Sequence, residues 1–362
     1  MKDPYRLKVI TLEGSPKERG RIHGETLKHM ILEIIERYKY YLQFNYNKDP
    51  DQLITYFLSN THFLSAVKKW TPMLLEEIEG IAEGVGIDFK EIFALQMVAH
   101  DEGWWLFQRS DHSEKCSSLG CFREKNQPTL VAQNLDLPNY FEGSEVLFQI
   151  KHDDSSLEAY VLSHAGFLGE FGMNNHPLGI CCNSMSNLLN NSPNGLPFTF
   201  IIRTVLEQLS LERAVEFIYN LQHASAQNYI IGDLERVISL ECSANKVIQF
   251  EPYKDARRVY HTNHPIKNDD VIIPPLKPVF ISTSYDRFNY LESRLRDPSK
   301  IITVDTIKNI LSSHFGPVCV HHNNQPNSGY TFSSGIYELS SHPSLYITIG
   351  PPCLTIYERF KF

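Results

Sequence analysis

Three polar stretches of the chain carry residue types and spacings suited to nucleophilic acyl chemistry. Residues 116–118 (CSS) offer a thiol followed by two hydroxyls, and residues 133–136 (QNLD) end on a carboxylate. Residues 261–264 (HTNH) place a side-chain amide directly before a histidine and a proline. A cysteine becomes a nucleophile where a base or a positive field lies beside it, and an amide can donate to a developing oxyanion. These stretches therefore contain the parts of a thiol-dependent acyl-transfer site.

Each of these residues also has an ordinary structural role that the sequence leaves open. A single cysteine such as Cys116 is usually a small buried hydrophobe, and Asp136 at a strand end is commonly a turn residue. Asn263 before a proline is equally suited to a turn. What favours catalysis is spacing, because neighbouring antiparallel strands would bring Cys116 and Asp136, 20 positions apart, close together.

The histidines also suggest a metal site. His261 and His264 form an HxxH pair, but residues three apart in an extended segment point to opposite faces, so the two imidazoles do not easily meet one ion. His314, His321 and His322 could complete a site, yet no HExxH pattern accompanies them. We expect no metal, and a zinc-dependent hydrolase is the weaker alternative.

The elements that must position these residues change character near residue 112. Before it, apolar residues recur at helical spacing over residues 25–42, 53–58, 74–82 and 91–98, after one strand at 7–13. After it, strands are predicted at residues 129–133, 146–151, 158–162, 178–182, 229–232, 237–241, 247–250, 259–261, 335–339, 344–349 and 354–359. Helices are predicted at residues 198–209, 214–221, 286–296 and 305–312. Strands joined by tight turns predict antiparallel sheets with helices as outer layers, an α+β fold.

The only abrupt boundary is a polar, charged run at residues 109–115, directly before Cys116. Such a run is commonly a solvated loop, and it is also an accessible place for chain cleavage. We therefore divide the chain into a helical N-terminal segment, residues 1–115, and a catalytic part, residues 116–362, with the first segment packed on the same domain.

Composition excludes several classes of protein. The 362 residues are 42% hydrophobic and 21% charged, as in a globular protein, and the net charge of −8 offers no footprint for nucleic acid. No window approaches the roughly 18 apolar residues of a membrane helix, and the N-terminus has no apolar signal core. The seven cysteines are scattered and form no CxxC pair. This pattern favours a reducing compartment, so we expect a cytoplasmic protein that contacts neither nucleic acid nor membrane.

With these residues in hand, the chain resembles the acyl-coenzyme A:6-aminopenicillanic acid acyltransferase (isopenicillin-N N-acyltransferase) family of N-terminal-nucleophile (Ntn) hydrolases. Five motifs in the same order carry the resemblance: residues 14–24 (GSPKERGRIHG), 76–84 (EEIEGIAEG), 116–118 (CSS), 133–136 (QNLD) and 261–264 (HTNH). The chain departs from the family pattern at Lys115, where glycine is typical, at Leu135, where tryptophan is typical, and at Val320, where arginine is typical.

The resemblance implies a fold and a mechanism. The fold is a four-layer αββα Ntn-hydrolase sandwich, in which two antiparallel sheets are stacked between helical layers. The Cys116 thiol would attack the Lys115 carbonyl and free its own α-amine, so that one residue supplies both nucleophile and base. Asn263 would then donate to the oxyanion, Asp136 would orient the new amine, and Ser118 would hydrogen-bond in the site.

The resemblance also implies what the site accepts. Asn134 and Val320 would contact a small-molecule amide or acyl-thioester substrate, acyl-coenzyme A included, without a cofactor. Val320 removes a cation that could pair with a carboxylate, so we expect apolar acyl groups, unless Arg203 or Arg287 supplies the charge. Lys115 before the cysteine keeps one alternative open, an unprocessed, noncatalytic family member that binds small molecules.

Overall fold

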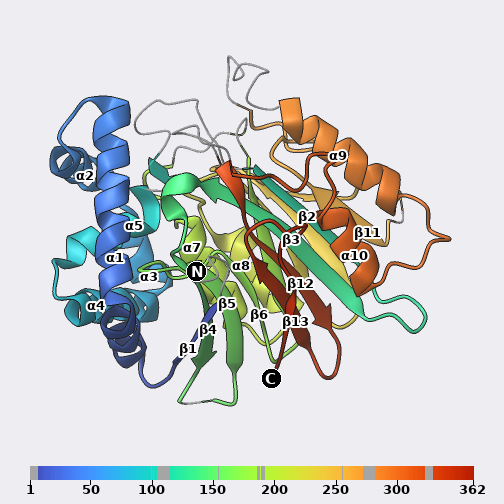
Figure 1. The fold of residues 1–362 in the computed structure, drawn as a ribbon, viewed down its shortest axis with the longest axis horizontal. Coiled ribbons are helices and arrows are strands. Elements are labelled where there is room, and N and C mark those ends of the chain that lie inside the picture. The colour runs from blue at the N-terminus through green and yellow to red at the C-terminus, as the bar shows by residue number, and fades with distance from the viewer. Residues whose placement is uncertain are drawn as a thin grey trace.

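The computed structural model describes residues 7–98, 100, 102–103, 115–153, 155–185, 188, 192–254, 256–271, 282–322 and 329–362. Within them, two stacked β-sheets lie between two layers of helices (Figure 1). The sheets meet through β2 and β3 of one and β7 and β8 of the other. The predicted four-layer αββα sandwich of the α+β class is thereby confirmed.

The eight-stranded sheet has the order β1-β4-β5-β6-β7-β8-β9-β10. All its neighbouring strands are antiparallel except β1, which runs parallel to β4. The N-terminal segment therefore contributes the edge strand of this sheet. The strands are β1 (Lys8–Leu12), β4 (Glu145–Lys151), β5 (Glu158–His164), β6 (Phe171–Asn174), β7 (Gly179–Ser184), β8 (Gln227–Gly232), β9 (Val237–Cys242) and β10 (Val247–Phe250).

The six-stranded sheet has the order β11-β2-β3-β12-β13-β14 and is antiparallel throughout. It contains all three stretches from which the acyl chemistry was inferred, on β2, on β3 and at the end of β11. Its strands are β2 (Lys115–Cys121), β3 (Thr129–Pro138), β11 (Arg258–His261), β12 (Gly329–Leu339), β13 (Ser344–Ile349) and β14 (Glu358–Lys361).

The helices divide between the two outer faces (Figure 1). α7 packs on β6 and β7 of the eight-stranded sheet, whereas α9 and α10 pack on β2, β3, β11 and β12 of the six-stranded sheet. The helices are α1 (Pro16–Tyr46), α2 (Pro50–Ser59), α3 (Phe63–Trp70), α4 (Pro72–Val85), α5 (Phe89–Val98), α7 (Phe198–Leu206), α8 (Leu211–Asn220), α9 (Ser282–Leu295) and α10 (Val304–Leu311). None of the helices in the described part of the chain combines the length and apolar character needed to cross a membrane.

Two of the motifs that carry the family resemblance are structural. Gly20 and Gly24 of α1 face Gly80 and Gly84 of α4, and a Cβ on Gly20 would lie only 1.9 Å from the carbonyl oxygen of Glu77. The glycines let the two helix backbones touch. α1 consequently extends nine residues further toward the N-terminus than the predicted start at residue 25, and a capping box formed by Ser15 and Glu18 begins it.

A buried ion pair joins two helices of this layer. Arg203 of α7 makes a bidentate ion pair with Glu77 of α4, at 2.8 and 3.1 Å. Arg203 is 1% exposed, and its hydrogen bonds go to Glu77 and to the Leu168 carbonyl oxygen rather than to β2. Arg203 therefore does not supply a cation to the predicted site.

The strand and helix predictions were otherwise right in type, with three errors. The strand predicted at residues 354–359 is a turn followed by β14, which begins only at Glu358. The eight-residue helix α3 and the four-residue strand β6 were missed. Both are too short for periodicity to distinguish them from a loop.

Candidate active site

The pairing of β2 with β3 brings the predicted nucleophile and the predicted carboxylate together. Cys116 lies opposite Leu135, and Lys115 lies opposite Asp136. Because side chains alternate along a strand, Cys116 and Ser118 face the other sheet, whereas Lys115 and Asp136 face the helical layer. Asp136 thus lies opposite the residue that precedes Cys116, and its carboxylate is on the opposite face of the sheet from the Cys116 thiol.

The backbone of Cys116 is held on both sides by two side chains. Its N–H donates to Asn263 Oδ1 at 3.0 Å, and its carbonyl oxygen accepts from Arg287 Nη1. Arg287 Nη1 also donates to Ser117 Oγ at 3.1 Å, and its Nη2 donates to Asn263 Oδ1 at 2.8 Å. Cys116 is 3% exposed and Arg287 1%, so this arrangement lies in the interior.

Asn263 is placed by the pairing of β11 with β2 and by the first turn of α9. His261 lies opposite Ser118, which carries residues 262–264 past the end of the strand, beside Cys116. Ser284 Oγ accepts from the Asn263 N–H at 2.8 Å and lies 2.8 Å from His264 Nδ1. The side-chain amide is thereby aimed at β2.

A buried carboxylate fixes the rest of this segment. Glu241 Oε1 lies 2.8 Å from His261 Nε2, and the two carboxylate oxygens accept the backbone N–H groups of Ile266, Lys267 and Asn268. Burial opposes ionisation of Glu241, but these hydrogen bonds and the histidine lower its pKa below the usual range.

On the inner face of β2, Ser118 donates to Asn183 Oδ1 of β7. Asn183 Oδ1 also lies 3.4 Å from Asn228 Nδ2, so both of its neighbours donate to the same oxygen. Asn183 Nδ2 is buried and has no hydrogen-bond partner in the described part of the chain. A buried donor without a partner costs about 1–3 kcal/mol, so it is suited to an acceptor supplied by a ligand.

On the outer face, Asp136 is buried and accepts from Thr331 Oγ1 at 2.7 Å. Burial raises the pKa of Asp136 to about 7, although Thr331, Arg287 and Lys115 all act in the opposite direction. Burial also lowers the pKa of Lys115, and Arg287 adds to that effect. The carboxylate is therefore poised to change charge near neutral pH.

The two predicted substrate-binding residues have mainly backbone neighbours. Asn134 lies on the outer face, where Nδ2 donates to the carbonyl oxygens of Leu311 and Val318, each at 2.8 Å. Val320 is fixed through its own backbone, which exchanges two hydrogen bonds of 2.9 Å with Thr331. Asn134 Oδ1 is buried without a hydrogen-bond partner among the described residues.

The histidines do not converge as the zinc-hydrolase alternative requires. His261 pairs with Glu241 and His264 with Ser284, and neither belongs to a potential ligand cluster among the described residues. His322 lies 3.6 Å from Glu142. His314 and His321 do lie together, with their ring centroids 4.9 Å apart, but with cysteines rather than with the site around Cys116.

Neither Asn183 nor Arg287 is predicted by the sequence as a catalytic residue. Arg287 is expected there only as an alternative source of charge, and it lies in a helix with no distinctive motif. Asn183 directly follows the predicted strand at residues 178–182 and carries no turn signal of its own. Only the tertiary structure brings either residue to Cys116 or Ser118.

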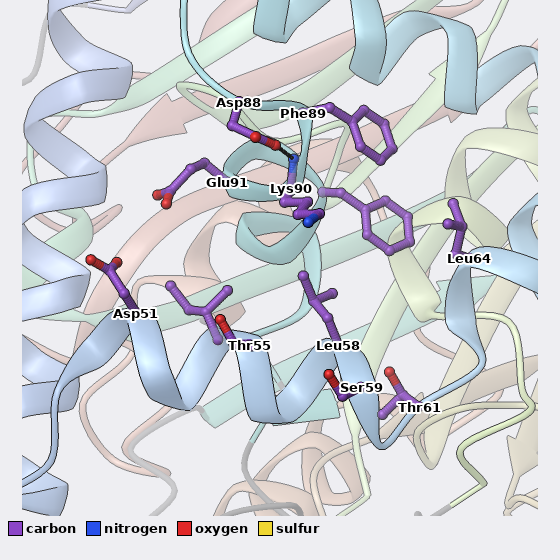
Figure 2. A pocket seen from close by; sticks show the side chains of 12 residues that line it. Asp51, Thr55, Leu58, Ser59, Thr61, Leu64, Asp88, Phe89, Lys90 and Glu91 are labelled. Carbon is purple, nitrogen blue, oxygen red and sulfur yellow. Dashed lines mark hydrogen bonds between the residues drawn. The ribbon is translucent and has the colours of Figure 1, made fainter.

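The helical layer has a pocket of its own, with a volume of about 500 Å³, between α2 and α5 (Figure 2). Figure 2 shows Asp51, Thr55 and Leu58 of α2 facing Phe89 and Glu91 of α5. None of its lining residues belongs to the site around Cys116. The pocket is therefore separate from the site inferred from the sequence.

Comparison with known proteins identifies the family. The family model for acyl-coenzyme A:6-aminopenicillanic acid acyl-transferase matches residues 122–351. The chain belongs to this family. Asp136, Asn263 and Val320 lie inside the matched range, and Cys116 stands six residues before it. The resemblance read from the five motifs is confirmed, and with it membership in a family of acyl-transferring and amide-hydrolysing enzymes.

Individual relatives are distant. The 40 kDa form of acyl-coenzyme A:6-aminopenicillanic-acid-acyltransferase from Emericella nidulans is 25% identical over 288 residues, covering 79% of this chain and 76% of that protein. Protein dcd1A of Dictyostelium discoideum is 26% identical over 243 residues, covering 59% of this chain but only 53% of its own length. Among solved structures, a Caenorhabditis elegans ortholog of N-acylethanolamine-hydrolyzing acid amidase matches with a TM-score of 0.45 and 15% identity, covering 62% of this chain and 92% of that one.

Proposed function

We propose that this family member is a self-processing cysteine Ntn hydrolase that transfers or hydrolyses acyl groups through a Cys116 acyl-enzyme. The observation that carries the proposal is a pair of hydrogen bonds to the Cys116 backbone. Asn263 accepts from its N–H, and Arg287 donates to its carbonyl oxygen. A structural cysteine in a β-strand needs neither a buried guanidinium nor a buried amide on its backbone. A residue whose α-amine is to become a working group needs both its nitrogen and its orientation fixed.

Processing would be the first use of the site. Cys116 Sγ attacks the Lys115 carbonyl carbon, the thiol proton passes to the Cys116 nitrogen as the C–N bond breaks, and the acyl group moves from nitrogen to sulfur. Water then hydrolyses the thioester, which yields a Lys115 carboxylate, a free Cys116 thiol and a free α-amine. The products are the chains 1–115 and 116–362. They would stay associated, because β1 of the first is hydrogen-bonded along β4 of the second.

In the mature site the Cys116 amine would act as the general base. An α-amine has an ordinary pKa near 7.7–8.0, which suits proton transfer near neutral pH. Asn263 Oδ1 already accepts from this nitrogen and would keep it oriented, and Asp136 would balance its charge from the opposite strand. The amine takes the thiol proton, the thiolate attacks the substrate carbonyl, and the proton passes to the leaving group.

Two amides would stabilise the oxyanion. Asn263 Nδ2 carries two hydrogens and donates one to the Ser184 carbonyl oxygen at 3.0 Å, which leaves the second for the reaction. Asn183 Nδ2, buried without a partner among the described residues, is the second donor. Ser118 holds Asn183 in the orientation that exposes this nitrogen.

The substrate would be a linear amide or acyl thioester of an apolar acid. The Emericella relative is named for acyl-coenzyme A and 6-aminopenicillanic acid, so both a thioester donor and an amine acceptor are consistent with the family. Here Arg287 is occupied by Cys116, Ser117 and Asn263, and Val320 offers no charge. Neither residue is therefore available to pair with a substrate carboxylate. None of the seven cysteines forms a disulfide, which fits a reducing, cytoplasmic setting.

Intact-mass measurement after denaturation tests the proposal. We expect two chains whose masses correspond to 1–115 and 116–362, and a single full-length chain for Cys116→Ala. Cys121→Ala, which changes a buried cysteine on the same strand, is the matched control and should be processed. A wild-type chain that stays intact after long incubation at neutral pH would instead support an unprocessed binding protein. A Cys116→Ala protein that turns over substrate would remove the nucleophile assignment.

A further inference from the structure

Two histidines and two cysteines converge on the six-stranded sheet at a place the proposed acyl chemistry does not use. His314, Cys319 and His321 come from the segment between α10 and β12, and Cys353 comes from the turn between β13 and β14. One nitrogen or sulfur atom from each of the four lies within 4.8 Å of all the others. Three of these residues are close in the sequence, but Cys353 follows His321 by 32 positions, so the fold itself completes this cluster.

We propose that His314, Cys319, His321 and Cys353 bind one zinc ion. Two thiolates and two imidazoles form a Cys₂His₂ donor set, which is typical of tetrahedral zinc and unsuited to calcium or magnesium, since those ions take oxygen ligands. All four tetrahedral positions are filled by protein, which leaves no open position for water or substrate. The ion would therefore be structural, unlike the ion in the zinc-hydrolase alternative.

The distances between the donor atoms are close to those expected in a zinc site. Cys319 Sγ and Cys353 Sγ are 3.5 Å apart, and His321 Nε2 lies 3.0 Å from Cys353 Sγ. Zn–S bonds of about 2.3 Å and Zn–N bonds of about 2.0 Å at tetrahedral angles separate donor atoms by roughly 3.3 to 3.8 Å. Small side-chain rotations bring the four donors to these separations.

The backbone around the cluster is already held in place. Cys319 N–H donates to the Ser313 carbonyl oxygen at 3.2 Å, and Leu354 N–H donates to that of Pro351 at 2.9 Å. His314 and His321 are exposed, so an ion can enter from solvent, whereas Cys319 is buried beneath them. Because the ligands are prearranged, binding needs little reorganisation of the chain.

A disulfide between Cys319 and Cys353 is the competing outcome. Oxidation would join the two sulfurs and leave both histidines without a role. A metal accounts for all four side chains at once, and it suits the reducing compartment that the cysteine pattern favours. The two outcomes differ in mass and in metal content, so one sample distinguishes them.

The zinc would stabilise the segment between α10 and β12, which runs beside the proposed acyl-transfer site. Val320 lies between two of the ligands. Its N–H donates to Thr331 Oγ1, its carbonyl oxygen accepts from the Thr331 N–H, and Thr331 Oγ1 donates to Asp136. The ion would tie this segment to the turn after β13. The proposal concerns the fold alone and does not depend on the chemistry assigned to Cys116.

The test is metal analysis of the untagged full chain, purified under reducing conditions after growth with added zinc. We expect about one zinc per chain, the stoichiometry of a four-ligand site. His321→Ala and Cys353→Ser should lose it. Replacement by Co²⁺ should give the visible absorption of a tetrahedral site with a thiolate-to-cobalt charge-transfer band, which reports the ligands in the wild-type chain even if a variant fails to fold.

Two controls separate this site from the acyl chemistry. Cys116→Ala should retain the zinc, because it changes only the proposed nucleophile, and His29→Ala should retain it, because His29 is an exposed histidine on α1. Chelation should lower the melting temperature of the wild type more than that of Cys353→Ser. A reduced chain that takes up neither Zn²⁺ nor Co²⁺ would overturn the proposal, as would loss of two hydrogens in a metal-free chain, since that indicates a Cys319–Cys353 disulfide.

Discussion

Arg287 Nη2 donates to Asn263 Oδ1 at 2.8 Å, and this contact fixes which way the Asn263 amide faces. The Cys116 N–H donates to the same oxygen, so two donors converge on it and the amide nitrogen must point the other way. Asn263 is thereby both an acceptor for the nitrogen that processing would free and a donor toward the inner face. The two functions can be separated by substitution.

Asn263→Asp should separate them, because it keeps the acceptor oxygen and removes the N–H donor. We expect processing and turnover to slow by roughly 10²–10³, the usual loss for one oxyanion donor. Asn263→Ala removes both functions and should be at least as slow. The measurements are the rate of Lys115–Cys116 cleavage and kcat for a simple amide. If either variant matures normally and only its KM rises, Asn263 binds substrate and does not stabilise the oxyanion.

Asn183→Ala should slow turnover to a similar extent, because the Asn183 amide nitrogen is a buried donor that has no hydrogen-bond partner among the described residues and is free to meet the oxyanion. The variant should also lose stability, because Ser118 Oγ and Asn228 Nδ2 lose the acceptor Asn183 Oδ1. Asn174→Ala on the neighbouring strand β6 is the matched control, since Asn174 Nδ2 donates to two carbonyl oxygens at 2.9 Å. That control should lower the melting temperature and leave the kcat of the folded fraction unchanged. An Asn183→Ala enzyme with wild-type kcat would exclude this donor.

Arg287→Lys should slow processing although it keeps the charge. A lysine ammonium cannot contact the Cys116 carbonyl oxygen and Asn263 Oδ1 in the forked geometry of a guanidinium. Loss of one charge-assisted hydrogen bond corresponds to roughly 10- to 100-fold in rate. Arg294→Lys, an exposed position on the same helix, is the control and should process at the wild-type rate. Equal rates for the two variants would mean that Arg287 contributes charge alone.

The pairing of β2 with β3 was predictable, and the residues that complete the site were not. Cys116 and Asp136 stand on neighbouring strands at a separation that a short hairpin dictates, so alternation and turn signals were sufficient. Arg287 reaches Cys116 from a helix 171 positions away, and no local pattern encodes such a contact. The same holds for Asn183, which comes from the opposite sheet.

The N-terminal helices show a different limit of sequence reading. Gly20 and Gly24 look like helix breakers, so the sequence places the start of α1 after them. In the structure they are required inside the helix, because a Cβ at either position would collide with α4. Helix propensity was overridden by a close tertiary contact that only the partner glycines, Gly80 and Gly84, could have indicated.

Asp136→Asn should change the pH dependence of stability in the Cys116→Ala background, which keeps the chain intact. Burial raises the pKa of Asp136 from 3.8 to about 7, so the folded state holds this proton more tightly than the unfolded state. The resulting stabilisation is complete below pH 3.8 and is lost as the pH rises through 7. At about 1.4 kcal/mol for each pKa unit, the loss is up to about 4 kcal/mol.

Urea unfolding at pH 4 to 8 measures this effect. The free energy of unfolding of the Cys116→Ala chain should fall relative to that of the Asp136→Asn double variant as the pH rises. Glu145→Gln is a useful comparison, because burial also raises the pKa of Glu145 to about 7 and it should show the same trend. A difference between the two chains that does not change with pH would show that Asp136 ionises normally.

Substrate class can be tested by changing the charge beside the site. Val320 offers no cation and Arg287 is committed to Cys116, Ser117 and Asn263, so the mature wild-type enzyme should prefer amides or thioesters of apolar acids. A panel of acyl-amino acids, acyl-amines, acyl thioesters and penicillins compares kcat/KM for the wild type and for Val320→Arg. We expect the variant to gain on the carboxylate-bearing members, since an arginine can pair with a carboxylate through two hydrogen bonds. Val320→Leu is the control for size alone and should show no such gain. A wild-type preference for penicillins would contradict this expectation. It would mean that Arg287 leaves its partners to bind the substrate, because Arg203 is paired with Glu77 in the helical layer.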